Sequence, residues 1–294
     1  MARRGRSSSG RAEGANRGAK RPRADGERAG GGRQSSRGER AGGGRESSRG
    51  ERPAGGDPLP ILYGRNPVRE ALRGRRKVRR VWATAAAARE PWLRDIAVER
   101  ADVAEIAERC GSPEHQGVCA EVDRYPYADA ARLVAAPDAL VVALDEVQDP
   151  QNLGAVCRAA ECAGATGVVV PERRAAEVTP AVAKASAGAV EHLPVARVRN
   201  LADFLGEAKA TGCWCYGAAS SGGVPYDAPD YAGGVVVVLG SEGRGLRPRV
   251  AAACDALIAL PLCGKVESLN VGATAAVILY EILQARRGKV DSDS

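Results

Sequence analysis

Three polar or glycine-rich segments contain the residue types that could bind a ligand and act on it. The first is DEVQDPQNLG at residues 145–154, with Arg158 shortly after it. The second is GSEGRGL at 240–246, and the third is PLCGKVESLN at 261–270. Carboxylate, amide and guanidinium groups can orient a substrate and handle protons, and glycines let the backbone approach a ligand closely. If the fold brings the segments together, they predict a binding site with acid–base capacity.

Each segment follows a short apolar run that predicts a buried strand. These runs are residues 140–144, 235–239 and 257–260, with further strands expected at 168–170, 195–198 and 213–217 and helices at 153–163, 179–187, 200–210 and 270–286. Thr179 is the expected N-cap of its helix. Such alternation is typical of an α/β fold with a mostly parallel sheet and helices on both faces. Because ligands bind at the carboxyl ends of parallel strands, we expect the three segments to share one crevice.

Every one of these residues also has a purely structural interpretation. Asn152 could serve only as a helix N-cap, and Arg158 could be an ordinary surface residue. The glycines of 240–245 could serve only a tight turn, and Ser268 and Asn270 could only cap the last helix. The occurrence of three such segments on one edge of the sheet favours a site.

Other well-known site chemistries do not match. A phosphate-binding P-loop needs Ser or Thr after Gly-Lys, but Gly264-Lys265 is followed by valine. Residues 240–245 spell G-x-x-G-x-G rather than the dinucleotide fingerprint, which argues against a nicotinamide-dependent dehydrogenase. None of the 8 cysteines forms a C-x-x-C pair and only 2 histidines are present, so we expect no metal site. Cys213 and Cys215 should share one buried strand face as reduced thiols.

The chain divides into a basic tail and a nearly neutral body. Residues 1–58 carry a net charge of +8, slightly more than the +7 of the whole chain. They are rich in Gly, Arg and Ser and repeat a polar unit, which predicts disorder. The basic tail suggests a nucleic acid partner, although it could be only solubilising. No apolar stretch approaches the roughly 20 residues of a membrane span, and no secretory signal is visible, so we expect a cytoplasmic protein.

A smaller α/β unit precedes the larger domain that contains the three polar segments. We expect strands at 81–83 and 117–122, a short helix ending at Leu72 after an apolar stretch at 61–64, and another helix over 92–109. The resulting boundaries are 59–124 for this unit, 125–138 for a linker and 139–288 for the larger domain. Six basic residues cluster within the smaller unit and are its candidates for holding RNA: Arg73, Arg75, Arg76, Lys77, Arg79 and Arg80.

The sequence resembles the SpoU, or TrmH, class of RNA ribose 2′-O-methyltransferases. The matching motifs are DPQNLG at 149–154 through Arg158, GSEGRG at 240–245 and SLNV at 268–271. Tyr63-Gly64 and His115-Gln116-Gly117 also resemble the family's N-terminal substrate-binding domain. The closest likeness is to enzymes that methylate a guanosine of 23S ribosomal RNA, and it covers roughly residues 60–286.

This resemblance implies a fold, a cofactor and a set of site residues. It implies a C-terminal trefoil knot, a homodimer and S-adenosylmethionine bound mainly by backbone groups, here at Gly240, Leu260, Leu262 and Leu269. The expected catalytic residues are Asn152, Arg158, Glu242, Ser268 and Asn270. Asn152 and Arg158 would hold the target nucleotide and its phosphate, and Glu242 would orient Arg158 or the ribose. Ser268 and Asn270 would complete the pocket.

Two alternatives remain open from the sequence. One is the same reaction on transfer RNA or on another ribosomal RNA nucleotide. The other is a non-catalytic RNA-binding protein, such as a ribosome assembly factor, against which the five intact catalytic candidates argue.

Overall fold

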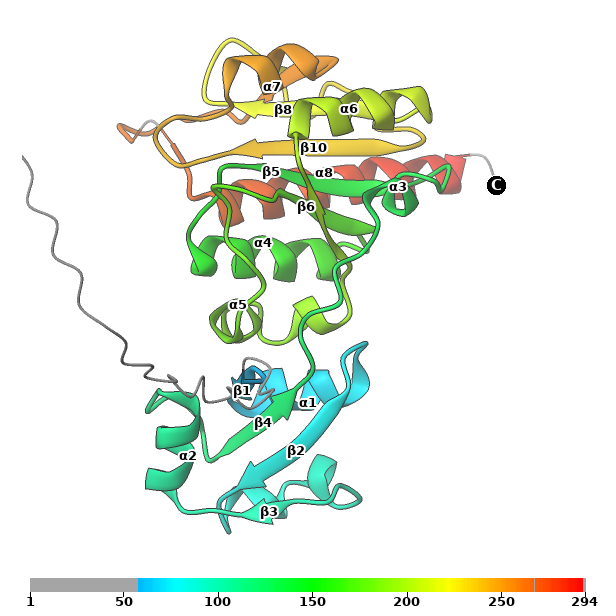
Figure 1. The fold of residues 1–294 in the computed structure, drawn as a ribbon. Helices are drawn as coiled ribbons and strands as arrows, with labels where there is room; N and C mark the ends of the chain where they lie inside the picture. Colours follow the sequence, from blue (N-terminus) through cyan, green and yellow to red (C-terminus); the bar gives the residue numbers. More distant parts are fainter. Residues whose placement is uncertain (1–57, 267, 293–294) are drawn as a thin grey trace, which may run out of the picture. The chain divides into compact units, whose positions relative to one another are not determined.

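The computed structural model describes residues 58–266 and 268–292. The predicted disordered tail, 1–58, lies outside these ranges except for its last residue. The described residues form a sheet of 4 strands and a sheet of 7 strands. The smaller sheet is formed by the first part of the described chain (Figure 1).

The smaller sheet has the strand order β1-β4-β2-β3. Its strands are β1 (Ile61–Tyr63), β2 (Val78–Ala83), β3 (Glu99–Arg100) and β4 (Val118–Val122), and its helices are α1 (Arg65–Arg73) and α2 (Val103–Cys110). The prediction of one helix over 92–109 is wrong. A 3₁₀ turn at Pro91–Leu93 and strand β3 occupy its first half, and α2 begins only after Asp102. Asp102 starts the helix because its carboxylate accepts from the Glu105 amide at 2.8 Å, while the Glu105 side chain accepts from the Asp102 amide.

The expected linker 125–138 is a packed segment that contains helix α3 (Ala130–Leu133). Leu133 and Val134 are buried within the larger domain. The Tyr125 hydroxyl lies 2.9 Å from the carbonyl oxygen of Leu193, which anchors the start of the segment. These contacts follow from its apolar residues, which gain more from burial than from exposure to water.

The larger sheet has the order β7-β6-β5-β10-β8-β11-β9 and every pairing in it is parallel, as predicted. Its strands are β5 (Leu140–Asp145), β6 (Gly167–Pro171), β7 (Val195–Val198), β8 (Trp214–Ala219), β9 (Val224–Pro225), β10 (Val235–Gly240) and β11 (Ala256–Ala259). The central pair matters most for the site. Gly240 lies in register with Asp145, so the first and second polar segments begin side by side.

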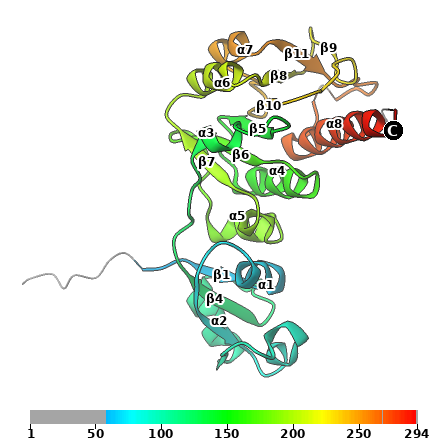
Figure 2. The same cartoon turned by 90° about the vertical axis from the view of Figure 1, so that its right-hand side faces the viewer.

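Helices cover both faces of this sheet (Figures 1 and 2). Helices α4 (Pro150–Cys162) and α8 (Val271–Ser292) pack on one face, and α6 (Leu201–Ala210) and α7 (Pro248–Ala253) pack on the other. Helix α5 (Pro180–Ala185) packs against α4. Alternate strand residues divide between the two cores, with Val142 in the first and Val141 in the second. Cys213 and Cys215 both enter the second core, which confirms the predicted shared face.

Thr179 precedes α5 as expected, but its hydroxyl does not cap the helix. Its side chain makes no hydrogen bond to the first turn, and Oγ1 is buried without a partner among the described residues. Pro180 has no amide hydrogen, so the first turn of α5 has one backbone donor fewer that needs a hydrogen-bond acceptor.

Candidate active site

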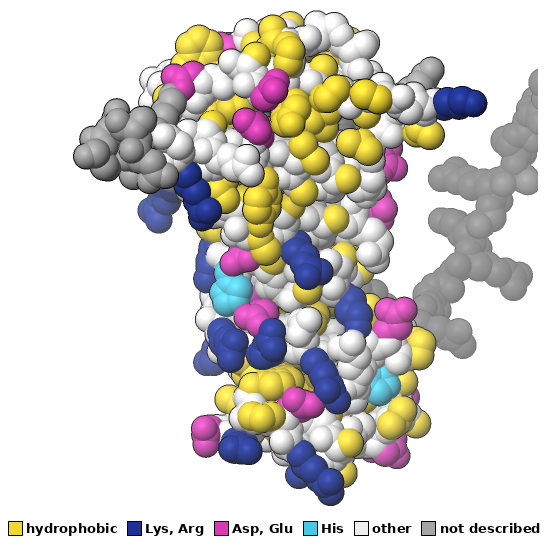
Figure 3. Space-filling model, turned by 180° about the vertical axis from the view of Figure 1, so that it is seen from behind, with side chains coloured by type: hydrophobic (Ala, Val, Ile, Leu, Met, Phe, Trp, Pro, Cys, Tyr) yellow, Lys and Arg dark blue, Asp and Glu magenta, His cyan; other side chains and the backbone are white. Residues whose placement is uncertain are grey.

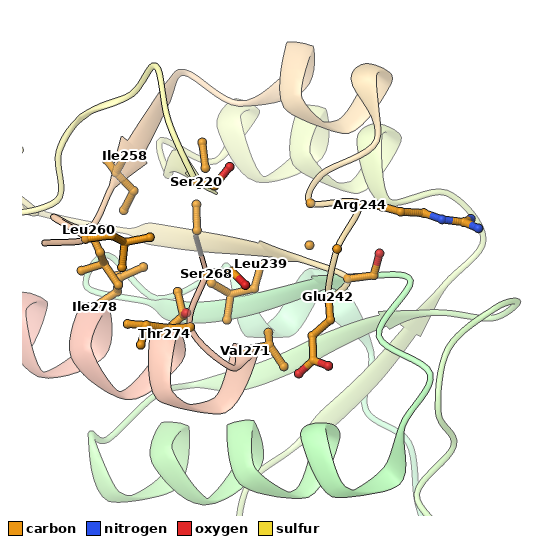
Figure 4. Close-up of a pocket in the computed structure, with 18 residues that line it drawn as sticks. Ser220, Leu239, Glu242, Arg244, Ile258, Leu260, Ser268, Val271, Thr274 and Ile278 are labelled. Atoms are coloured by element: carbon orange, nitrogen blue, oxygen red, sulfur yellow. The ribbon is translucent and has the colours of Figure 1, made fainter. Parts of the chain in front are cut away.

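A cavity of about 340 Å³ opens at the carboxyl ends of β8, β10 and β11. Ligand sites commonly have volumes of roughly 300–1,000 Å³. Figure 4 shows Leu239, Ile258, Leu260 and Ile278 forming its apolar wall, whereas Ser220, Glu242, Ser268 and Thr274 supply polar groups. The second and third polar segments thus meet at one cavity, as expected from the order of strands and loops in the sequence.

All four residues expected to contact a cofactor line this cavity: Gly240, Leu260, Leu262 and Leu269. Gly240 is required by the fold of the loop that follows it. A Cβ placed there would lie 2.1 Å from the carbonyl carbon of Gly245, because the loop doubles back against the end of β10. The Gly245 amide closes the turn by donating to the Ser241 carbonyl at 2.9 Å. The result is a tight backbone cradle on the cavity rim.

Asn152, Glu242 and Asn270, from the three separate segments, form one hydrogen-bond network. Asn152 Nδ2 donates to Glu242 Oε1 at 3.1 Å. Asn270 Nδ2 donates to Glu242 Oε1 and to Asn152 Oδ1, each at 2.8 Å. Glu242 lines the cavity, so the network stands at its rim.

The network has one consistent orientation. Asn270 Oδ1 accepts a hydrogen bond from the Gly272 amide at 2.8 Å, which leaves Nδ2 to face the other two side chains. Because Asn152 must then present its oxygen to Asn270, its own amide nitrogen faces Glu242. A backbone amide in the first turn of α8 therefore fixes the direction of every donor in the group.

The structure separates the structural and functional interpretations of the two asparagines. Asp149 caps α4 by accepting from the Gln151 amide at 2.9 Å, so Asn152 is not a cap. Asn270 does act as a cap for α8, through the bond from Gly272, and joins the network as well.

Arg158 does not join this network. Its side chain is exposed and makes no hydrogen bond or ion pair within residues 58–266 and 268–292. The expected contact between Glu242 and Arg158 is therefore absent there. Six residues of α-helix rotate a side chain by about 240° (3.6 residues per turn), so Asn152 and Arg158 leave α4 in different directions.

Ser268 lies on the cavity wall as predicted, and its side chain is exposed there. Leu269 beside it also lines the cavity and is 46% exposed, a large value for leucine. Arg244 belongs to the glycine-rich loop but extends away from the cavity in Figure 4. The polar side chains on the cavity wall therefore include Ser220, Glu242, Ser268 and Thr274.

An ion pair that was not apparent from the sequence holds the glycine-rich loop. Asp145, at the end of β5, is completely buried. Its carboxylate accepts from the backbone amide and from Nε of Arg247, each at 2.8 Å. The hydrogen bond to Asp145 raises the pKa of the Arg247 guanidinium. This double contact fastens the chain just beyond the loop to the strand beside it, and a strand-ending acidic residue was its only sequence signal.

The basic cluster of the smaller sheet is mostly exposed, with one exception. Arg73, Arg75, Lys77, Arg79 and Arg80 are exposed, but Arg76 is buried. Arg76 Nε donates to Glu191 Oε2 at 2.8 Å, and its second contact is to Glu191 Oε1. The prediction that Arg76 binds RNA is therefore corrected, because its guanidinium is already paired away from solvent. In Figure 3, Lys and Arg side chains gather on the part of the surface that carries the smaller sheet.

Two other kinds of feature are absent from the described ranges. Within them, no three His, Cys, Asp or Glu side chains are grouped as metal ligands would be. No helix there is long and apolar enough to cross a membrane.

Comparison with known proteins matches both sheets to family models. Residues 139–280 match the SpoU rRNA methylase family, and residues 61–128 match the RNA 2′-O ribose methyltransferase substrate-binding family. YacO of Bacillus subtilis, described as a TrmH family tRNA/rRNA methyltransferase, is 37% identical over 243 residues. The matched region covers 76% of this chain and 94% of that protein. An uncharacterized tRNA/rRNA methyltransferase of Mycolicibacterium vanbaalenii is 38% identical over 79% of this chain and 78% of its own length.

Solved structures agree with the sequence comparison. The SpoU methyltransferase AviRb of Streptomyces viridochromogenes, crystallised with S-adenosylmethionine, has a TM-score of 0.66 and 26% identity, covering 78% of this chain and 90% of that one. A Sinorhizobium meliloti rRNA methyltransferase with the same cofactor has a TM-score of 0.65 and 27% identity, covering 78% and 87%. This chain belongs to the SpoU/TrmH family of tRNA/rRNA methyltransferases.

Proposed function

We propose that the protein transfers a methyl group from S-adenosylmethionine to a ribose 2′-oxygen of RNA. The observation that carries the proposal is the network of Asn152, Glu242 and Asn270 at the rim of the 340 Å³ cavity. It places a carboxylate and two oriented amides beside a space large enough for a nucleoside-like cofactor. A non-catalytic RNA-binding protein would have no need of such a group.

The cavity fits S-adenosylmethionine, which is the methyl donor of the proposed reaction. Its apolar wall of Leu239, Ile258, Leu260 and Ile278 suits an adenine ring. Leu260 and Leu262 follow the end of β11, where backbone groups leave the sheet and are free to meet the polar edge of a ligand. Gly240, Leu260, Leu262 and Leu269 are the residues proposed to hold it. When bound, this cofactor supplies a methyl group already activated by its sulfonium charge.

The residues of the chain would then align the ribose and manage its proton. Glu242 Oε1 is occupied by the two asparagines, whereas Oε2 makes no hydrogen bond within the described ranges. We assign Oε2 to the ribose hydroxyl, from which it can accept a hydrogen bond and which it can thereby orient. Ser268 would complete the pocket wall.

Arg158 is proposed to hold the nucleotide or its phosphate. Because its side chain is exposed and makes no ion pair within the described ranges, its five donors are available for bidentate contact. The role of general base is demanding for a guanidinium, which is a donor only and does not readily give up its proton. The assignment to catalysis therefore leaves the proton step of Arg158 unspecified.

The substrate is proposed to be ribosomal RNA, at a guanosine of the 23S molecule. The smaller sheet would hold the RNA, with Arg73, Arg75, Lys77, Arg79 and Arg80 contacting phosphates. The match of residues 61–128 to a substrate-binding family supports this role of the smaller sheet. Transfer RNA is the second candidate, because the similar proteins carry names that include both substrates.

Further features of the family are part of the same proposal. We propose domain limits of 59–124 and 139–288 with 125–138 between them, a trefoil knot near the C-terminus and a cytoplasmic location where ribosomal RNA is found. We also propose a homodimer. Helix α8 supports it, since its large apolar side chains Val277 and Tyr280 are 40% and 45% exposed.

The test is methyl transfer to purified RNA with mapping of the product. Wild-type protein and Glu242→Gln protein, both shown by calorimetry to bind S-adenosylhomocysteine, are incubated with labelled S-adenosylmethionine and ribosomal or transfer RNA. We expect only the wild type to make a linkage resistant to alkali, the mark of a ribose 2′-O-methyl group. A methylated base as the product, or equal transfer by both proteins, would contradict the proposal.

A further inference from the structure

A second cavity lies at the same edge of the larger sheet, next to the candidate active site. It has a volume of about 390 Å³ and is walled by five arginines: Arg173, Arg174, Arg199, Arg247 and Arg249. We infer that this arginine cleft binds phosphates of the RNA strand on one side of the methylated nucleotide. The inference rests on the proposed function for the identity of the polymer, but the cleft itself is defined by its own residues.

The balance of charge in the cleft favours an anion. Arg247 pairs with Asp145 and Glu146, and Arg174 also pairs with Glu146. Arg249 pairs with Asp203. These three carboxylates oppose five guanidinium groups, which leaves an excess of positive charge on the walls.

Arg173 and Arg199 are the two arginines of the cleft whose guanidinium donors are available to a ligand. Both are exposed, and neither side chain makes a hydrogen bond or ion pair within residues 58–266 and 268–292. Arginine presents several donors in a planar fork that matches phosphate oxygens. Unpaired arginines facing a shared cavity are the groups that a phosphodiester would engage first.

The paired arginines make the cleft a built feature rather than a collection of mobile side chains. Asp145 has no exposed surface and the Glu146 side chain is only 11% exposed, so these carboxylates hold Arg247 from the protein side. Arg247 still has 44% of its side chain exposed. All three nitrogens of its guanidinium pair with these two carboxylates, so the group is held in place while part of the side chain faces solvent.

The first turn of helix α6 adds to the same field. Asn200 and Ala202 line the cleft, and the Asn200 side chain caps the ten-residue helix by accepting from the Ala202 amide at 3.0 Å. The amino end of a helix carries a partial positive charge that favours anions. Here it acts together with the arginines rather than alone.

One chain segment connects the cleft with the active site. Gly240 lines the first cavity, Glu242 belongs to the catalytic network, and Arg247 walls the second cavity. Asp145, which holds Arg247, is the register partner of Gly240 on the neighbouring strand. A single RNA strand lying along this edge would therefore place one ribose at Glu242 and adjoining phosphates in the arginine cleft. An isolated phosphate would need no such continuity, so we assign the cleft to the polymer.

The test compares two variants that remove the same charge from opposite edges of the sheet. Arg173→Gln/Arg199→Gln removes the two unpaired arginines of the cleft. Arg132→Gln/Arg287→Gln removes two exposed arginines, from α3 and from the last part of α8, near the amino ends of the strands. Neither of these control side chains makes a hydrogen bond or ion pair within the part of the chain that the structure describes. Binding of a labelled single-stranded RNA of mixed sequence to the full chain is followed by fluorescence anisotropy over a range of KCl concentrations.

We expect the cleft variant to bind RNA more weakly at low salt and the control variant to match the wild type. The slope of log affinity against log salt should become shallower by about 0.7 for each phosphate that the variant no longer neutralises. Unchanged slope and affinity in the cleft variant would overturn the inference, and so would an equal decrease in both variants.

Two added measurements keep the outcomes distinct. Inorganic phosphate is titrated into both proteins; if the cleft variant loses phosphate binding but keeps RNA affinity, the site takes a small anion and the inference fails. Binding of S-adenosylhomocysteine should be equal in all variants, because none of the four arginines lines the first cavity. Failure of the proposed function would instead appear as no methyl transfer by the wild type, with the RNA-binding comparison still interpretable.

Discussion

Asn270 donates to Asn152 at 2.8 Å with one end of its amide and accepts from the Gly272 backbone at 2.8 Å with the other. One side chain therefore begins helix α8 and orients the polar network at the cavity. This double use is the reason that residues from three separate segments meet in a defined direction.

Replacing Asn270 by aspartate should separate the two roles. In the wild type, Asn270 Nδ2 lies 2.8 Å from Glu242 Oε1. Aspartate keeps the oxygen that caps α8 but places a second oxygen, which cannot donate, where Nδ2 was. Loss of a hydrogen bond to a charged group costs about 1.5–3 kcal/mol, so we expect methyl transfer to fall roughly ten- to a hundredfold. Initial rates and thermal midpoints should be measured for Asn270→Asp and Asn270→Ala. Only the alanine variant should also lose the cap, about 1 kcal/mol of stability; full activity of the aspartate variant would refute the role given to the donor.

Arg158→Ala should lose activity without losing stability. The side chain is exposed and makes no contact within the described ranges that folding would require. We expect the unfolding free energy to stay within about 0.5 kcal/mol of the wild type, while turnover falls about a hundredfold, as for loss of a contact that positions the reacting nucleotide. Arg94→Ala, at another exposed arginine, is the matched control. If Arg158→Ala turns over like this control, Arg158 has no part in the reaction.

Arg76→Met should be strongly destabilising. The Arg76 and Glu191 side chains are 1% and 0% exposed, so removing one partner leaves the other as a buried charge without its ion pair. Such a loss costs about 3–5 kcal/mol, measurable by urea unfolding. Arg80→Met, at an exposed position of the same cluster, should stay within about 0.5 kcal/mol. The double variant Arg76→Met/Glu191→Met should recover much of the lost stability. If it does not, the pair stabilises the fold by more than the mutual neutralisation of two buried charges.

Stability should decline in alkali because of buried thiols. Burial raises the pKa of Cys157 from 9.0 to about 12, so the folded protein keeps a proton that the unfolded chain releases. The contribution is complete below pH 9.0 and is lost as the pH rises toward about 12. Urea unfolding over that interval should show a smaller decline in Cys157→Ala than in the wild type. Equal declines would mean that Cys157 does not titrate differently in the two states.

Deleting residues 1–58 should weaken RNA binding and flatten its salt dependence. That segment carries a net charge of +8, whereas the remainder of the chain is close to neutral. Binding of S-adenosylhomocysteine and the thermal midpoint should be unchanged, since the described residues that line the cavity all lie in the part of the chain that remains. Unchanged affinity of the truncated protein at low salt would count against an RNA role for the tail.

Much of the larger sheet was predictable because its strands are continuous apolar runs. The run at 235–239 became the central strand β10, buried along nearly its whole length. Parallel strands end at one edge, so the polar residues after β5 and β10 had to lie together. That geometric rule was enough to bring Asn152 and Glu242 into one site.

The errors arose where tertiary contacts decide the outcome. Strand β9 has 2 residues and helix α7 has 6, lengths too short to give a periodic pattern. Arg76 looked like its exposed neighbours because its partner, Glu191, lies 115 residues away in sequence. The arginine cleft was missed for the same reason, since its walls come from separate segments that each look like ordinary surface loops.

The two duties of Asn270 also limit how this protein can diverge over evolution. A descendant that abandoned methyl transfer would still need a capping side chain at the start of α8, and Ser, Thr or Asp would satisfy that need. Asn152 and Glu242 have no such second duty in the helices around them and would be free to drift. Relatives that have lost methyl transfer should therefore keep a short polar residue at position 270, while the residues at positions 152 and 242 vary.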